Sequence, residues 1–320
     1  METKLDLLDK KILNALNYDC RATYSQIARE VRSSKEVINY RIQRLIKQGI
    51  IKGFVTIFGF GYWSYKLLVD FSKIDIKKET EILEYLRSHP NINWVTPCSG
   101  GYDLVFSIMA KGPDHFDKLL RGIMGDIGNF IRDYKVATSI SSQTFGHTYI
   151  LGKVNEPDIV GRKFSVFEFD NKDKEIAKLL HTNARIALTE ISQKTNIPID
   201  TVTYRIKKME RSGIIRRYRV ILDPQKLGYH RYEIFLRCIS LSDSIIAKFK
   251  EYARQNPHIE YFSRCIGAWD IEFTVYFKTS DELRGFILEV KERFGEHIQK
   301  FETITLFETH NFVYLPEELR

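Results

Sequence analysis

Two stretches of the chain decide its fold: KEVINYRIQRLIKQGII at residues 35–51 and IDTVTYRIKKMERSGII at residues 199–215. In the first stretch Ile38, Ile42 and Leu45 recur at helical spacing, and polar residues fill the positions between them. A glycine then ends the helix, and β-branched residues follow it. Each stretch therefore predicts an amphipathic helix that leads into a strand.

The similarity of these stretches extends over most of the chain. An offset of 164 residues places Arg21 on Arg185, and a later offset of 167 places Cys98 on Cys265. The sequence is therefore a tandem duplication of a two-module unit. The predicted parts are a helical module at 1–60, a mixed α/β module at 61–152, a linker at 153–165, a second helical module at 166–228 and a second mixed module at 229–320.

The first module of each half has the pattern of a winged helix-turn-helix. Apolar spacing predicts a helix from Asp6, a second from Thr23 and a third from Ser34 to Gln48, with Ile50 to Phe58 as a strand or hairpin wing. Thr23 and Gln26 form a capping-box pattern that the second copy lacks.

The second module of each half predicts the order βαββαβ, which is a ferredoxin-like unit with helices on one face of an antiparallel sheet. The predicted fold class is thus α+β, with two winged helix-turn-helix domains alternating with two ferredoxin-like βαββαβ domains. The expected elements of the first copy are strands at 65–72, 92–98, 104–109 and 131–150 and helices at 79–88 and 113–127.

Composition narrows the function. The 320 residues carry a net charge of +8, and each helical module contributes +5. Apolar runs are too short for a membrane helix and residues 1–11 are too charged for a signal peptide, so we expect a cytoplasmic protein without membrane contact. Four cysteines without a CxxC pair indicate neither a metal site nor disulfides. We expect no catalytic residues, no metal and no cofactor.

The third helix of each copy suits the major groove of double-stranded DNA, which is wide enough to admit it. Residues near its N-terminus would reach bases: Lys35, Glu36, Asn39 and Tyr40, with Ile199, Asp200, Thr203 and Tyr204 in the second copy. The expected phosphate contacts are Arg41, Arg44, Lys52, Arg205, Lys208, Arg216, Arg217 and Arg219. As alternatives, winged helices also bind proteins, and the two tyrosines can be packing residues.

The run from Leu5 to Leu13, with Arg21 and the segment from Tyr40 to Ile51, resembles the Lrp/AsnC family of transcription regulators. In that family a winged helix-turn-helix precedes a small-ligand-binding module of the βαββαβ (RAM) type. The second half is similar too, and the first departs from the pattern where Phe58-Gly59-Phe60-Gly61 replaces an Asp-Pro segment.

The resemblance implies an amino-acid effector at a Gly-x-Tyr-Asp type turn between paired sensor modules. The matching residues are Gly100, Gly101 and Asp103 in the first copy and Gly267 and Asp270 in the second. The glycines would let bare N–H groups approach a carboxylate, and the Asp would accept from an ammonium. The alternative is a strand-connecting turn in which the Asp caps its own backbone.

The expected function is therefore sequence-specific DNA binding in transcription regulation, without enzymatic activity. Two other functions stay open: a siroheme-decarboxylase-like enzyme on the same architecture, and an architectural DNA binder of low specificity. The enzyme would use His147, His230, Arg231 and His310 to hold a polycarboxylate. The sensor modules can pair within one chain or in a homo-oligomer.

Overall fold

The computed structural model describes residues 4–152, 158–160, 167–307 and 315. They form two compact units, a helical unit and a barrel unit, and each unit takes its residues from both halves of the chain. The helical unit contains residues 4–61 and 167–228, and the barrel unit contains residues 62–152, 158–160 and 229–307. Residues 153–157 and 161–165 of the predicted linker, together with His310, lie outside the described residues.

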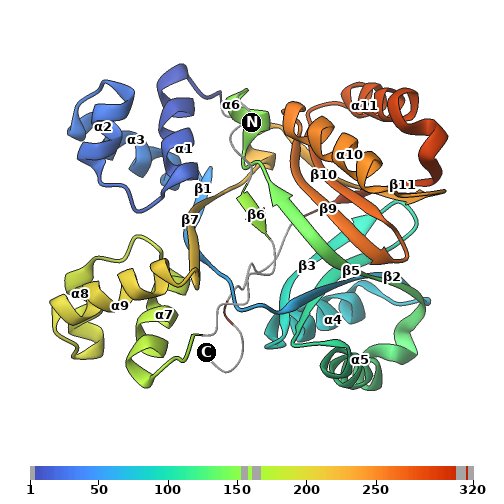
Figure 1. Ribbon diagram of the computed structural model, residues 1–320, viewed down its shortest axis with the longest axis horizontal. Helices are drawn as coiled ribbons and strands as arrows, with labels where there is room; N and C mark the ends of the chain where they lie inside the picture. The colour runs from blue at the N-terminus through green and yellow to red at the C-terminus, as the bar shows by residue number, and fades with distance from the viewer. Residues whose placement is uncertain (1–3, 153–157, 161–166, 308–314, 316–320) are drawn as a thin grey trace. The chain divides into compact units, whose positions relative to one another are not determined.

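The helical unit holds two copies of a three-helix bundle with one strand each (Figure 1). Asp6 and Thr23 cap their helices with capping boxes as expected, and Ala187 gives α8 no side-chain cap. The elements are α1 (Leu7–Tyr18), α2 (Tyr24–Val31), α3 (Lys35–Lys47) and β1 (Ile51–Phe58), then α7 (Asn171–Thr182), α8 (Leu188–Thr195), α9 (Ile199–Arg211) and β7 (Ile215–Leu222).

Of the expected strand or hairpin wing at Ile50 to Phe58, the strand forms, and it pairs with the other half of the chain. β1 and β7 form a two-stranded antiparallel sheet, with Val55 opposite Arg219. Each strand also contacts the first helix of the other copy: β1 lies against α7 and β7 against α1. A single strand per copy has no hairpin partner of its own, so the other copy supplies it.

The barrel unit confirms the predicted ferredoxin-like modules. We call residues 62–152 the first barrel module and residues 229–307 the second. The first contains β2 (Trp63–Phe71), α4 (Ile76–Ser88), β3 (Ile92–Ser99), β4 (Leu104–Ala110), α5 (Pro113–Ile127), β5 (Ile131–Thr144) and α6 (Thr148–Leu151). The second contains β8 (His230–Cys238), α10 (Asp243–Gln255), β9 (Ile259–Gly267), β10 (Ile271–Phe277), α11 (Ser280–Phe294) and β11 (Ile298–Leu306).

The two sheets join into one closed barrel of eight strands. Their order is β2-β4-β3-β11-β8-β10-β9-β5, and a β2–β5 pairing closes the ring. The short strand β6 (Asp158–Val160) adds to β5. The modules meet where β3 pairs with β11 and where β5 pairs with β9. The two barrel modules therefore pair within one chain.

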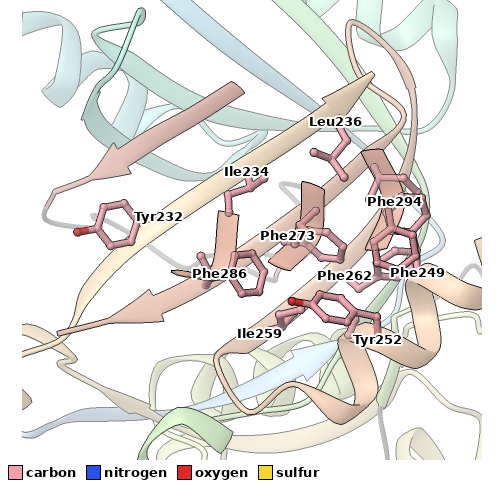
Figure 2. Packing of buried hydrophobic residues seen from close by; sticks show 14 of the residues in the cluster. Tyr232, Ile234, Leu236, Phe249, Tyr252, Ile259, Phe262, Phe273, Phe286 and Phe294 are labelled. Atoms are coloured by element: carbon pink, nitrogen blue, oxygen red, sulfur yellow. The ribbon is translucent and has the colours of Figure 1, made fainter. Parts of the chain in front are cut away.

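Each barrel module has its own apolar core between sheet and helices. Figure 2 shows the second, where Phe262 and Phe273 on the sheet meet Phe249 of α10 and Phe294 of α11. The rings of Phe249 and Phe294 stack at 4.1 Å between centroids. A further cluster, which includes Trp94, Phe235 and Trp269, contains side chains from both modules. Packing of these aromatic side chains against one another leaves the helices on the outer face of the barrel.

Candidate nucleic-acid interface

The outer face of α3 carries the side chains that the sequence assigned to base contacts. Ser34 caps the helix by accepting from the Val37 N–H at 3.2 Å, and Ile38, Ile42 and Leu45 turn the opposite face into the core. This fixes the direction of the remaining positions. The four side chains assigned to bases, Lys35, Glu36, Asn39 and Tyr40, are all exposed.

The exposure of the tyrosines bears on whether they serve as contact or packing residues. Tyr40 is 67% exposed, and its counterpart Tyr204 on α9 is 66% exposed. Aromatic side chains that serve as packing residues are normally buried. Both rings are therefore available to a partner, at the same position of each helix.

The equivalent face of α9 has different chemistry. Ile199 is 41% exposed and stands where α3 has Lys35, and Asp200 is exposed as well. Thr203 is half-buried, and its hydroxyl donates to the Ile199 carbonyl at 2.8 Å. The two faces therefore present different donors and acceptors.

The expected phosphate contacts on α3 and α9 are tied to the first helix of their own copy. Arg41 Nη1 lies 2.6 Å from Asp6 Oδ2 and 3.0 Å from Asp9 Oδ1. Arg205 repeats this with Asp170 at 2.7 Å and Asp173 at 2.8 Å. The hydrogen bond from Arg41 lowers the pKa of Asp6, and the Asp173 N–H with Arg205 lowers the pKa of Asp170. These arginines are thus each held by one exposed and one buried carboxylate, with which phosphates would have to compete.

Two further basic residues of these helices are also engaged. Arg44 Nη2 donates to both carboxylate oxygens of Asp9 at 2.6 Å. The Lys208 ammonium lies over the Phe167 ring at 5.0 Å from its centroid. An exposed cation at the turn before α3, Arg32, was missed from the sequence. Arg32 and its counterpart Asn196 have left-handed backbone, with φ of 55° and 53°. Asparagine is enriched in this conformation, so Asn196 is the sequence signal that could have located the turn.

The strand residues expected at phosphates lie in the β1–β7 sheet. Lys52 is 3.7 Å from Asp223, and Arg216 and Arg217 are half-buried. Arg219 is only 6% exposed, so its guanidinium does not face solvent as a phosphate contact would. The strand pairing explains this, because residues that a hairpin wing would expose lie here between the two copies.

The glycines of the expected effector turn let the two barrel modules approach. Gly100 has φ +115°, and a Cβ there would lie 2.7 Å from the Thr303 carbonyl oxygen of β11. Gly267 has φ +129°, and its Cβ would lie 2.4 Å from the Val136 carbonyl oxygen of β5. A side chain at either position would collide with the backbone of the other module. Gly101, at φ +109°, has open space around it.

The aspartates of the same turns hold backbone N–H groups of the neighbouring strand. Asp103 Oδ2 accepts from the Phe71 N–H, and Asp270 Oδ2 accepts from the Cys238 N–H, both at 2.8 Å. This is close to the alternative expected from the sequence, in which the Asp caps its own turn. Here each Asp caps the adjacent strand instead. Asp270 also lies 3.4 Å from Arg237.

The residues considered for the enzyme alternative lie in different surroundings. His147 is buried with its Nδ1 3.7 Å from Glu260 Oε1. Arg231 lies 3.4 Å from Glu233 and its guanidinium carbon 5.6 Å from the centroid of the Trp94 ring. His230 is exposed.

The described part of the chain gives little indication of a metal site or of a nucleophilic thiol. Among those residues no group of three or more His, Cys, Asp and Glu side chains is placed to hold a metal ion. Burial raises the pKa of Cys20 and of Cys98 to about 12, so these thiols are poor nucleophiles. None of the helices described is both long and apolar enough to cross a membrane.

Some known proteins match parts of this chain, and others match nearly its whole length. A family model described as winged helix-turn-helix DNA-binding matches residues 5–52 and 169–216. The uncharacterized HTH-type transcriptional regulator PH0140 of Pyrococcus horikoshii is 30% identical over 122 residues, which are 38% of this chain and 76% of that protein. The HTH-type transcriptional regulator FL11 of the same organism is 31% identical over 121 residues, 37% of this chain and 77% of that protein.

Solved structures of the siroheme decarboxylase NirDL match nearly the whole chain. One of them aligns with a TM-score of 0.64 over 97% of this chain and 94% of its own. The sequence identity is 13%, so the match concerns the fold. The duplicated architecture is therefore shared between the two chains.

Proposed function

Because this chain belongs to the Lrp/AsnC family of winged helix-turn-helix regulators, we propose that it is a sequence-specific DNA-binding transcription regulator with two different reading helices in one chain. The observation that carries the proposal is the exposed N-terminal half of α3 and α9, with Tyr40 and Tyr204 about two-thirds uncovered. A helix with this outward face fits the major groove, where base edges differ in their donors and acceptors.

The two helices predict an operator with unequal half-sites. Lys35 and Asn39 of α3 can donate to base edges, whereas Ile199 and Thr203 of α9 offer an apolar contact and a hydroxyl. A palindromic operator would give the two helices identical base pairs to read. We therefore expect an asymmetric sequence.

The test is selection of bound fragments from a random DNA library by the full chain, followed by sequencing. We expect one asymmetric motif, and Asn39→Ala should change the preferred bases in one half-site only. Recovery of no preferred sequence would favour the architectural binder instead, and that binder should show equal affinity for selected and random DNA at every salt concentration.

The proposal also includes an amino-acid effector that binds at Asp103. Asp103 is exposed, so its carboxylate is open to an ammonium while it also holds the Phe71 N–H. An effector that binds the folded chain raises its unfolding temperature. We expect a rise with one class of amino acid at millimolar concentration and its loss in Asp103→Asn, and no shift with any amino acid would remove the effector.

We further propose that the chain acts by binding and not by catalysis. The siroheme-decarboxylase alternative is favoured by the shared architecture and by the burial of His147. Arg231 and His147, however, already face the carboxylates of Glu233 and Glu260. Mixing the full chain with siroheme separates the two: we expect no spectral change and no release of carbon dioxide. Release of carbon dioxide would establish the enzyme, whereas a spectral change alone would show only that siroheme binds.

A further inference from the structure

Two ion pairs in the barrel each join a residue to its own counterpart in the other half. Lys66 Nζ donates to Glu233 Oε2, and Lys135 Nζ lies 3.3 Å from Glu302 Oε1. Both pairs span 167 residues, which is the offset that relates β2 to β8 and β5 to β11. A residue contacts its own counterpart only next to the axis that relates two copies. The two pairs therefore mark the pseudo-twofold axis of the barrel.

The inner pair is part of a buried group of charges. Lys66 also binds Glu272, and its ammonium lies 5.0 Å from the centroid of the Trp94 ring. Glu272 accepts from Trp269 Nε1 at 3.1 Å. At the position of Glu272 the first module has Val105, 167 residues earlier, so the carboxylates come from the second module alone and the ammonium from the first.

Pairing of like modules would place like charges at this axis. Two copies of the first module would bring Lys66 against Lys66 and Lys135 against Lys135. Two copies of the second would bring Glu233 and Glu302 against themselves, with Glu272 beside them and only Arg231 of each copy to offset the inner carboxylates. Like charges directly opposite each other are destabilising, and removal from water makes an uncompensated charge more costly still.

We propose that these two ion pairs make the barrel modules mutually selective, so that each accepts the module of the other half and rejects a second copy of itself. The chain thereby supplies both members of a complementary pair. The helical unit offers no such selection. Arg21 donates to the Ala184 carbonyl and Arg185 to the Cys20 carbonyl, a reciprocal arrangement that two identical copies could also make.

The first test reverses the outer pair in the full chain. Lys135→Glu creates the Glu–Glu contact of paired second modules, and Glu302→Lys creates the Lys–Lys contact of paired first modules. We expect each to raise the unfolding equilibrium constant in urea by about fivefold to tenfold, and the double variant to restore most of the lost stability. Glu302 also lies 2.7 Å from Lys300, so Glu302→Lys should be the more harmful change.

The matched control is the exposed pair Arg121–Asp117 on α5, which lies within one helix. Arg121→Glu should change stability little, and its effect should not respond to any change at position 302. If the two reversals at 135 and 302 are additive, with no restoration in the double variant, the proposal is wrong.

The second test asks which modules exchange. One full chain carries Lys66→Glu with Lys135→Glu, and another carries Glu233→Lys with Glu302→Lys, with a different affinity tag on each. Inside either chain like charges meet, but between the chains opposite charges meet. Co-expression should give co-purification several-fold above that of two wild-type chains with the same tags, and equal recovery in both would overturn the proposal. The outer substitutions alone serve where the buried ones prevent folding.

Discussion

The helical unit and the barrel unit join the same two halves by different chemistry. In the helical unit the contacts are reciprocal, since Arg21 and Arg185 each reach a backbone carbonyl of the other copy. In the barrel unit the counterparts Lys66 and Glu233 have opposite charge. Reciprocal contacts keep two copies alike in shape, whereas opposite charges tell them apart. A duplicated chain thus has diverged at its barrel axis while it kept its helical pairing symmetric.

The largest effect should come from the ammonium at the barrel axis. Lys66→Met leaves Glu272 without its cation and Glu233 with Arg231 alone, and loss of one partner of a buried ion pair costs about 3–5 kcal/mol. We expect that loss in the free energy of unfolding from urea titration. Arg121→Met on the exposed surface of α5 should change it by less than about 0.5 kcal/mol. Similar small losses in both variants would mean that the buried charges do not stabilise the pairing.

The next effect concerns pH at the same place. Burial, with Glu233 nearby, raises the pKa of Glu272 to about 7. A carboxyl whose pKa is raised on folding stabilises fully below its unfolded value of 4.5, and that contribution is lost as the pH rises through about 7. The change is on the order of 3 kcal/mol.

The measurement compares the full chain with Glu272→Gln between pH 4.5 and 8. The glutamine does not titrate. As the pH rises, the unfolding free energy of the unchanged chain should therefore fall relative to that of Glu272→Gln. A difference that stays flat would place the carboxyl in a more polar environment than the structure gives it.

A smaller effect is expected from the reciprocal arginines of the helical unit. Arg21→Ala and Arg185→Ala should each cost about 1.5–3 kcal/mol, because each leaves a carbonyl of the other copy without its charged donor. Arg185 should cost more, since it also donates to the Ala22 carbonyl at 3.1 Å. Urea unfolding of both variants checks this, and a loss at only one of the two would show that the pairing is not reciprocal.

The smallest effect is expected on the exposed tyrosines, and it should appear in DNA binding alone. Tyr40→Ala and Tyr204→Ala should each weaken binding of the selected operator by about 1–2 kcal/mol, as loss of a groove contact does. Fluorescence anisotropy gives the affinity. Unfolding free energies should stay within about 0.5 kcal/mol of the parent chain, because neither ring is buried. Loss of stability with unchanged affinity would make them packing residues.

Much of the fold followed from repetition in the sequence. The offset of 164 residues predicts α7 from α1 and α9 from α3, and the offset of 167 predicts β8 from β2, as the element bounds have it. Repeats and apolar periodicity are local in the chain, so they can be read without a structure. The expected strand from 131 to 150 was too long, because β5 ends at Thr144 and α6 follows.

The candidate site was only partly accessible to the same reasoning. Lys35, Asn39 and Tyr40 lie exposed as their helical spacing predicts. Arg41 has that spacing too, yet it binds Asp6 and Asp9, which are more than 30 residues away in the chain. Spacing gives the face of a helix but does not say which other helix covers it.

The sequence by itself determined the duplication, the module types and the outward face of the reading helices, because each depends on residues close together in the chain. Only the tertiary structure decided that β1 pairs with β7, that Gly100 and Gly267 serve close approach, and that Lys66 meets its own counterpart. Those contacts join residues more than 130 positions apart. Their partners are set by the closure of the barrel and the crossing of the strands, which no local pattern records.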